Sequence, residues 1–332
     1  VKLDYSYSAE QLAHLMANDS DGFNRWDASQ TLCLGILKQL TQDSLHERPL
    51  VLNSYLIDAY GTLLADRALD PAMVSLMLQL PTEALLHEDA ETIHAAAIHD
   101  ARSFLRSALA GGLADQFMAV YQRHNVQTTY APDSQQIGTR SLKNAALSYL
   151  MLVGDRGVDL AWEQFKSADN MTDKAAALSA LVNCPAAANY AEQALCEFEL
   201  DYRDEALVMN LWLQIQAINT QPDGLVRVRG LMNHSAFTMS NPNKLRSLIG
   251  AFCSANLVNF HNPDGSGYEF LQQQVITLNN QNPQVAARLV TPLTRWKKFA
   301  EPNAQLMRKA LQKIADEPGL VKDVLEIATK SL

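Results

Sequence analysis

Amphipathic helical spacing runs through almost the whole chain, and this feature most limits what the chain can fold into. From Ser8 onward, apolar residues recur at intervals of three and four, and Ser8 with Gln11 forms a capping box that marks the first helix start. Glycine is scarce, at 14 of 332 residues, which also favours helix over sheet. The pattern predicts an all-α protein.

The expected helices are separated by short polar or proline-containing connections. In the first half they cover about residues 23–42, 53–65 and 70–80, and two more lie within 90–124. In the second half they cover about residues 138–153, 157–167, 172–182, 185–198, 204–217 and 224–231. The polar segment 125–136 between these groups is interpreted as a soft boundary between two halves of one array.

Prolines recur at regular steps in the last third of the chain. The steps are 21, 20 and 19 residues, between Pro242, Pro263, Pro283 and Pro302. One further proline, Pro292, falls outside the series. A period of about 20 for one helix and its turn gives about 40 for a helical hairpin, the spacing of HEAT and armadillo-type repeats. We therefore predict an irregular, superhelical α-solenoid, an architecture that can exceed the usual size of a single globular core.

The first residues differ from the rest. Residues 1–7 alternate apolar and polar side chains as a strand does, and the alternation stops at Ser8. Because a lone strand has no pairing partner, we interpret residues 1–8 as the remnant of a preceding β-domain and 9–332 as the helical-repeat domain.

Charge and composition exclude several classes of partner. The net charge is −9 and the isoelectric point is about 5.4, so we expect no nucleic-acid partner. No apolar run approaches the ~20 residues of a membrane span. The four cysteines lack metal-site spacing and are interpreted as small buried thiols, which favours a cytoplasmic location: Cys33, Cys184, Cys196 and Cys253.

No catalytic motif is found. His-Glu pairs occur at 46–47 and 87–88, but neither continues to a second His, and the spacing of His87, His94 and His99 does not suit a metal site. There is no nucleophile elbow and no phosphate loop. From these absences we expect no metal or cofactor in this chain and no activity of the chain alone.

Two further motifs are interpreted as structural. Residues 262–267, Asn-Pro-Asp-Gly-Ser-Gly, are interpreted as a connector before a helix that starts near Tyr268. In the segment 23–28, we expect Trp26 to pack and Arg25 to pair with a carboxylate.

Two Asn-Pro pairs, at 241–242 and 282–283, mark helix starts that are each followed by an arginine, Arg246 and Arg288. Each start directs free backbone N–H groups and a cation beyond the helix end. In a solenoid, equivalent helix ends lie along one rim. Two interpretations remain open: the arginines clamp a carboxylate, or each pairs with an acidic residue of a neighbouring helix and stiffens the stack.

Five stretches together resemble a known family, in order and from end to end of the chain. They are FNRWDA at 23–28, NMTD at 170–173, FTMSNPNKLRSLIGAF at 237–252, DGSGY at 264–268 and NPQVAARL at 282–289. They resemble the C-terminal helical domain of the bacterial aminopeptidase N family of zinc gluzincin peptidases. The resemblance implies that zinc and the catalytic residues lie on a separate catalytic domain, which partners this chain together with a β-sandwich domain.

The resemblance also implies a role for the helical domain. In the family it encloses the active-site chamber and gates the access of peptides, whose N-terminal residues are removed one at a time. The positions that match are Gln284, implied to line the pocket for the first side chain, and Arg288 and Arg246, implied to be chamber-facing cations that bind substrate.

A free-standing helical-repeat scaffold that binds a protein partner is the alternative, and an autonomous enzyme is the third possibility. The reading frame upstream of Val1 distinguishes the aminopeptidase domain from the free-standing scaffold. A scaffold has its own start there and lacks an upstream His-Glu-x-x-His domain.

Overall fold

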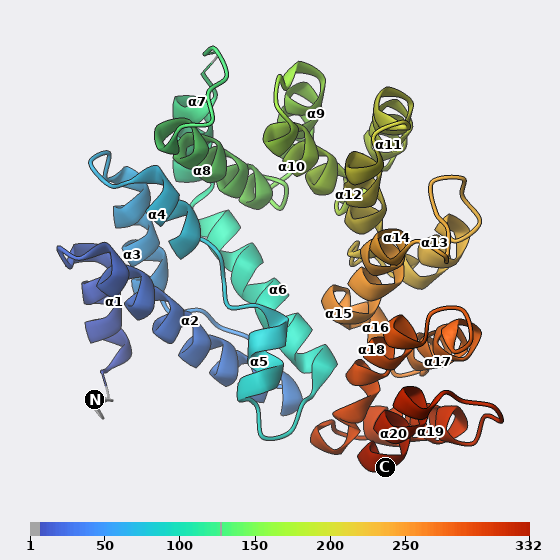
Figure 1. Cartoon of the computed structure of the whole chain (residues 1–332). Coiled ribbons are helices and arrows are strands. Elements are labelled where there is room, and N and C mark those ends of the chain that lie inside the picture. The colour runs from blue at the N-terminus through green and yellow to red at the C-terminus, as the bar shows by residue number, and fades with distance from the viewer. Residues whose placement is uncertain (1–6, 127) are drawn as a thin grey trace. The chain divides into compact units, whose positions relative to one another are not determined.

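The computed structural model describes residues 7–126 and 128–332, which form two compact units (Figure 1). Of the described residues, the first unit contains 7–86, 97–126 and 128–188, and the second contains 87–96 and 189–332. The regular elements of the described residues are all helical, apart from one isolated parallel bridge between Ile93 and Phe299. The all-α prediction is confirmed. The strand expected at 1–8 lies outside the described residues except for Tyr7 and Ser8, and the expected domain limits stay a prediction.

Helices of the first unit pair mainly with their neighbours along the chain. They are α1 (Ala9–Asn18), α2 (Gly22–Leu45), α3 (Ser54–Ala65), α4 (Pro71–Met77), α5 (Glu83–Asp89, which continues into the second unit), α6 (Ala95–Gly112), α7 (Ala114–His124), α8 (Ser134–Leu150), α9 (Asp155–Ser167), α10 (Met171–Val182) and the 3₁₀ turn η1 (Pro185–Ala187). α1 packs on α2 and α3, α8 packs on α4 and α7, and α9 packs on α10. The expected soft boundary at 125–136 falls at the connection from α7 to α8, inside this unit.

Side-chain caps mark the starts of several of these helices, and the cap of α1 is the one that the sequence analysis predicts. The backbone N–H of Gln11 donates to Ser8 Oγ (3.2 Å), and the Ser8 N–H donates to Gln11 Oε1 (2.9 Å), which completes the capping box of α1. Asp21, Asp70 and Asp133 accept backbone N–H groups at the starts of α2, α4 and α8. Each cap satisfies amide groups that a helix start leaves free.

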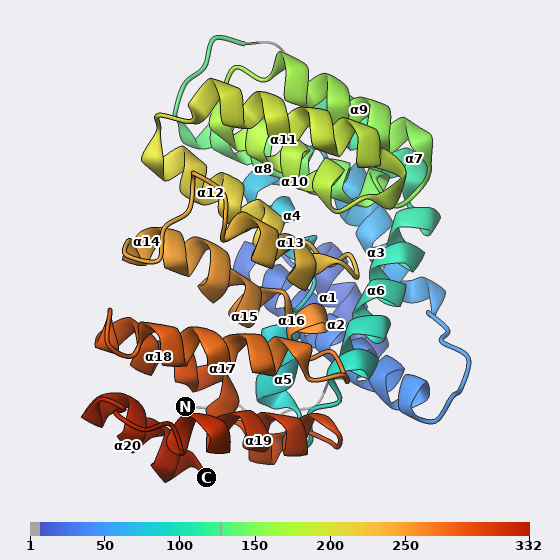
Figure 2. The same ribbon diagram turned by 90° about the vertical axis from the view of Figure 1, so that its right-hand side faces the viewer.

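The second unit is a stack of antiparallel helices, which Figure 2 shows as successive layers from α12 and α13 to α19 and α20. Its elements are α11 (Ala188–Tyr202), α12 (Ala206–Ala217), α13 (Gly224–Leu231), α14 (Pro242–Leu245), the π-helical segment η2 (Arg246–Gly250), α15 (Ala251–Ala255), α16 (Leu257–Phe260), α17 (Ser266–Leu278), α18 (Pro283–Thr294), the 3₁₀ turn η3 (Trp296–Lys298), α19 (Asn303–Ala315) and α20 (Lys322–Ser331). α17 packs on both α18 and α19, and α20 packs on α18 and α19.

The proline series marks helix starts only in part. Pro242 and Pro283 occupy the first positions of α14 and α18, after Asn caps, as predicted. Pro302 is the residue before α19, whereas Pro263 lies in the turn that precedes α17. Pro292 lies inside α18, two residues before its end, so a proline near a helix terminus does not break it here.

The core of the second unit is built around aromatic rings at the turn from α16 to α17. Phe260 lies nearly perpendicular to Tyr268 and to Phe252, with ring centroids 5.4 and 6.2 Å apart. All three side chains are fully buried. Edge-to-face pairs of this kind add to the free energy of apolar burial.

Two glycines make this turn possible. The connector expected at 262–267 ends earlier than predicted, because α17 already begins at Ser266. Gly265 has φ of 76°, a left-handed conformation that favours glycine. Gly267, the second residue of α17, lies close to the backbone of Phe260. A Cβ added there would clash with the Phe260 carbonyl oxygen and would lie 2.9 Å from the carbonyl carbon and the Cα of Phe260. The backbone there cannot retreat without disturbing the aromatic core.

We expect Gly267→Ala to lower the free energy of unfolding by about 3 kcal/mol or more, because the methyl group meets backbone atoms. Urea denaturation of the 332-residue chain measures this. Gly230→Ala in α13 is the matched control, since a Cβ there meets nothing within 4 Å and should stabilise the helix by up to about 1 kcal/mol. Equal effects of the two substitutions would contradict the steric explanation.

Candidate functional site

The three residues expected to bind substrate lie at helix starts of the second unit. Gln284 and Arg288 are exposed in the first two turns of α18. Arg246 is exposed where α14 passes into the π-helical segment. α14 and α18 both begin on the same edge of this unit, at the left of Figure 2. The structure therefore brings these helix starts to one edge, as expected for a repeat array.

The guanidinium groups at these positions are not neutralised by acidic side chains. Arg246 donates from Nε to the Pro242 carbonyl oxygen (3.2 Å) and from Nη2 to Asn243 Oδ1, both in its own helix. Among the residues that the structure describes, neither Arg246 nor Arg288 lies within 4.0 Å of a carboxylate, and the Gln284 amide has no hydrogen-bond partner. All three side chains are free to contact a ligand.

A second candidate is a polar cavity of about 950 Å³ in the first unit. It lies between the connection from α7 to α8 and the ends of α8, α9 and α10. Its charged lining residues carry both signs: Asp133, Arg140, Lys143, Asp169 and Asp173.

The floor of this cavity is a buried ion pair between α8 and α10. Lys143 Nζ lies 2.7 Å from Asp173 Oδ2, and both side chains are less than a tenth exposed. The same carboxylate accepts hydrogen bonds from Asn144 Nδ2 (2.8 Å) and Asn170 Nδ2 (3.1 Å). Asn170 also caps α10 by accepting from the Asp173 N–H (2.9 Å). The carboxylate is thus well satisfied and holds three segments together.

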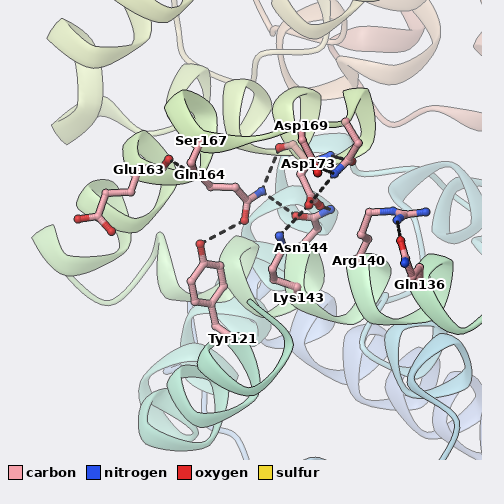
Figure 3. Close-up of polar contacts among 11 residues, drawn as sticks. Tyr121, Gln136, Arg140, Lys143, Asn144, Glu163, Gln164, Ser167, Asp169 and Asp173 are labelled. Carbon is pink, nitrogen blue, oxygen red and sulfur yellow. Dashed lines mark hydrogen bonds and ion pairs between the residues drawn. The ribbon is translucent and has the colours of Figure 1, made fainter. Parts of the chain in front are cut away.

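Gln164 of α9 extends the network to α7, as Figure 3 shows. Its Nε2 donates to Asn144 Oδ1 (2.8 Å) and to the Asp173 carbonyl oxygen (2.9 Å). Its Oε1 accepts from the Tyr121 hydroxyl (3.2 Å). Burial, together with the negative charges of Asp173 and Glu163, raises the pKa of Tyr121 to about 12, so the phenol stays a donor. We interpret this network as a clamp between four helices, because none of its groups is left available for acid–base chemistry.

Sequence reasoning found only part of this network. Asn170 and Asp173 lie in the NMTD motif, whereas nothing in the sequence marks Lys143 or Gln164 as their partners. Their pairing depends on how α8, α9 and α10 pack.

A buried polar cluster in the second unit surrounds His261. The Tyr268 hydroxyl lies within hydrogen-bond distance of His261 Nδ1 (2.9 Å) and accepts from Asn303 Nδ2 (2.7 Å). His87 lies beside His261, with ring centroids 5.6 Å apart. Burial first, and then the charges of His87 and Arg295, lower the pKa of His261 to about 3. The imidazole is therefore neutral at physiological pH.

Several sequence expectations need correction or stay open. Arg25 is structural but pairs with no carboxylate: it donates to the carbonyl oxygens of Met16 (3.0 Å) and Ala17 (2.7 Å) at the end of α1. Of the four cysteines, Cys33 and Cys253 are buried, as expected, but Cys196 is exposed. Burial raises the pKa of the Cys33 thiol to about 11.

Metal-binding clusters and membrane-spanning helices are both absent from the described residues, 7–126 and 128–332. No three or more His, Cys, Asp or Glu side chains are grouped to hold a metal ion there. No described helix is long and apolar enough to cross a membrane.

Comparison with known proteins covers the whole chain. A family model described as "Domain of unknown function (DUF3458_C) ARM repeats" matches residues 9–332. Aminopeptidase N of Escherichia coli (strain K12) is 40% identical over 334 residues, which span 100% of this chain and 38% of that protein. Aminopeptidase N of Haemophilus influenzae is 37% identical over 332 residues, with the same coverage of 100% and 38%. The chain therefore spans little more than a third of the length of these relatives.

Solved structures include a similar fold. The crystal structure of Legionella pneumophila aminopeptidase A in complex with aspartic acid matches with a TM-score of 0.88 and 28% sequence identity. The match covers 99% of this chain and 39% of that chain.

We expect Lys143→Met and Asp173→Asn each to lower the free energy of unfolding by about 3–5 kcal/mol, because each leaves a buried charge unpaired. Combining them should cost less than the sum of the two, since the double variant buries no unpaired charge. Denaturant unfolding of all four proteins measures the cycle. The exposed pair Lys330–Glu326 is the matched control, for which the same cycle should show much weaker coupling. Strict additivity at Lys143 and Asp173 would contradict the clamp.

His261 should make the fold acid-sensitive. Its pKa is about 3 in the folded chain against an ordinary value of 6.5, so the unfolded chain binds more protons in this window. The contribution is complete above pH 6.5 and is lost as the pH falls towards 3, with a slope of up to about 1.4 kcal/mol per pH unit.

Unfolding free energies of His261→Gln, measured by denaturation between pH 7 and about pH 4, should lack this contribution to the slope. Phe260→Leu is the control, because it loosens the same cluster without removing a titratable group and should lower stability equally at every pH. An unchanged slope in His261→Gln would rule the mechanism out.

Proposed function

The chain belongs to the ARM-repeat family DUF3458_C, the C-terminal domain of bacterial aminopeptidase N, and we propose that it forms the helical part of a zinc aminopeptidase that removes N-terminal residues from peptides. In this proposal it encloses the active-site chamber, gates the entry of peptides and contributes substrate contacts. The observation that carries the proposal is the 40% identity to aminopeptidase N over the whole chain. The free cysteines support a cytoplasmic location.

The proposed division of labour places the chemistry elsewhere. Zinc would polarise the scissile carbonyl and activate water from the catalytic domain, which would be the chain's main partner together with a β-sandwich domain. The described residues here include no metal-binding group, so their proposed part is to position the peptide and to exclude water.

Three side chains are proposed to contact the substrate. Gln284 would line the pocket for the first side chain, and Arg288 and Arg246 would hold the C-terminal part of the peptide or its carboxylate. Their exposure at helix starts on one edge of the second unit supports this role, as does the absence of a described carboxylate beside either arginine. A guanidinium can bind a carboxylate through two parallel hydrogen bonds.

In the full-length enzyme that contains this chain, we expect Arg288→Ala and Arg246→Ala to lower kcat/KM for peptides of four or more residues about tenfold or more, through the loss of a charge-assisted hydrogen bond. A dipeptide-sized chromogenic substrate should be cleaved almost unchanged, because it does not reach these positions. Steady-state kinetics with both substrates measure the difference.

Arg308→Ala is the matched control, since Arg308 is an exposed arginine of the same unit that lies in the middle of α19 and not at either helix start. It should leave both substrates unaffected. Unchanged kinetics on the longer peptides in Arg288→Ala and Arg246→Ala would remove the proposed substrate contacts.

A further inference from the structure

A second cavity in the first unit has a strongly one-sided charge. It measures about 650 Å³ and lies among the end of α4, the middle of α6, α8 and the start of α10. Arg102 and Arg106 of α6 line it, and no Asp or Glu is among its lining residues. This differs from the cavity over the Lys143–Asp173 clamp, where acidic and basic groups balance.

The two arginines present their charges to the same cavity. They lie four residues apart on α6, so their side chains project from one face of the helix. Arg102 donates from Nε to the Pro81 carbonyl oxygen (2.9 Å), and Arg106 donates from Nη2 to the Ser148 carbonyl oxygen (2.7 Å). These acceptors fix the orientation of both guanidinium groups but carry no net charge. Most of the five N–H donors of each guanidinium remain available to another group.

Their positive charge is poorly compensated. No described carboxylate lies within 4.0 Å of Arg102 or Arg106, and Tyr149 supplies only a ring face, 5.7 Å from the Arg106 guanidinium. Burial lowers the pKa of Arg106, and the like charge of Arg102 lowers it further, although Tyr149 opposes the shift. A guanidinium stays protonated all the same, so the site holds two partly buried cations side by side.

Further hydrogen-bond donors border the same cavity. Ser141 and Asn144 line it from α8, opposite the arginines of α6. The Asn144 amide is held in place by the Asp173 carboxylate (2.8 Å), so its orientation is fixed by the neighbouring clamp. Two guanidinium groups that are oriented by carbonyl oxygens and uncompensated by a carboxylate suit an oxyanion, whose oxygens accept several hydrogen bonds at once.

We propose that the cavity lined by Arg102 and Arg106 binds a small oxyanionic ligand that bears a carboxylate or phosphate group. The site lies entirely in the first unit, whereas the helix starts of α14 and α18 belong to the second unit. It does not depend on the proposed peptidase role, and either proposal can fail alone.

Calorimetric titration of the 332-residue chain with inorganic phosphate and, separately, with succinate tests the proposal. Chloride at matched ionic strength is the reference. We expect saturable 1:1 binding of at least one probe, and the stronger of the two identifies phosphate or carboxylate as the preferred group. Arg102→Gln/Arg106→Gln should raise Kd at least about tenfold, because charge-assisted hydrogen bonds are lost.

Arg123→Gln is the matched control. Arg123 also belongs to the first unit and donates to a backbone carbonyl oxygen, that of Leu64 (3.4 Å), but it lines only a small cavity of about 80 Å³. It should bind both probes as the parent chain does. A general salt effect of phosphate would give the same titration heats in every variant, and that result would overturn the proposal.

A second double variant, in which lysine replaces both arginines, keeps the test valid if the first variant fails to fold. If Arg102→Gln/Arg106→Gln does not fold, Arg102→Lys/Arg106→Lys keeps both charges but loses the planar fork, so it should bind the probe several-fold more weakly than the parent chain. Unchanged affinity in the Lys pair would contradict recognition by these guanidinium groups. Absence of saturable binding by both probes to the parent chain would overturn the proposal outright.

Discussion

Within each unit, packed helices are joined where a side chain of one segment donates to carbonyl groups left free at the end of another. A helix leaves its last four carbonyl groups without partners inside the helix, and a buried carbonyl without a partner is costly. Arg25 satisfies the end of α1, Asn256 donates to Ala217 at the end of α12 (2.9 Å), and Lys298 donates to Glu88 at the end of α5 (2.6 Å). A stack of many short helices has many such ends, so its cohesion depends on these long polar side chains as well as on apolar burial.

This way of joining helices shapes the electrostatics of the chain. A cation held by carbonyl oxygens is fixed in place but keeps its charge, whereas a cation held by a carboxylate is neutralised. Lys143 is of the second kind, and its pairing with Asp173 builds a rigid, charge-balanced clamp. Arg102 and Arg106 are of the first kind, as is Arg246, which contacts only a carbonyl and an amide of its own helix. Both proposed ligand sites therefore contain cations that no described carboxylate neutralises.

The local features of the fold were predictable to a large extent. The Ser8 capping box and the Asn-Pro starts of α14 and α18 form as expected, because a cap and the fixed φ of proline act within one turn of chain. Features that depend on neighbours in space were not foreseen. The helix α5 was not predicted, Arg25 contacts carbonyl oxygens where a carboxylate was expected, and Cys196 is exposed. A carbonyl acceptor has no signature in the sequence, since every residue carries one.

The candidate sites also combine features that follow from local sequence with features that depend on packing. The sequence by itself determined that the chain is helical, where most helices start, and that Gln284, Arg288 and Arg246 lie at or near helix starts, because each of these follows from interactions between residues a few positions apart. Only the tertiary structure decided that α14 and α18 begin on one edge of their unit, that Lys143 meets Asp173, and that Arg102 and Arg106 share a cavity without a carboxylate. The physical reason is that burial and charge compensation depend on which helices pack together, and packing joins residues far apart in the chain.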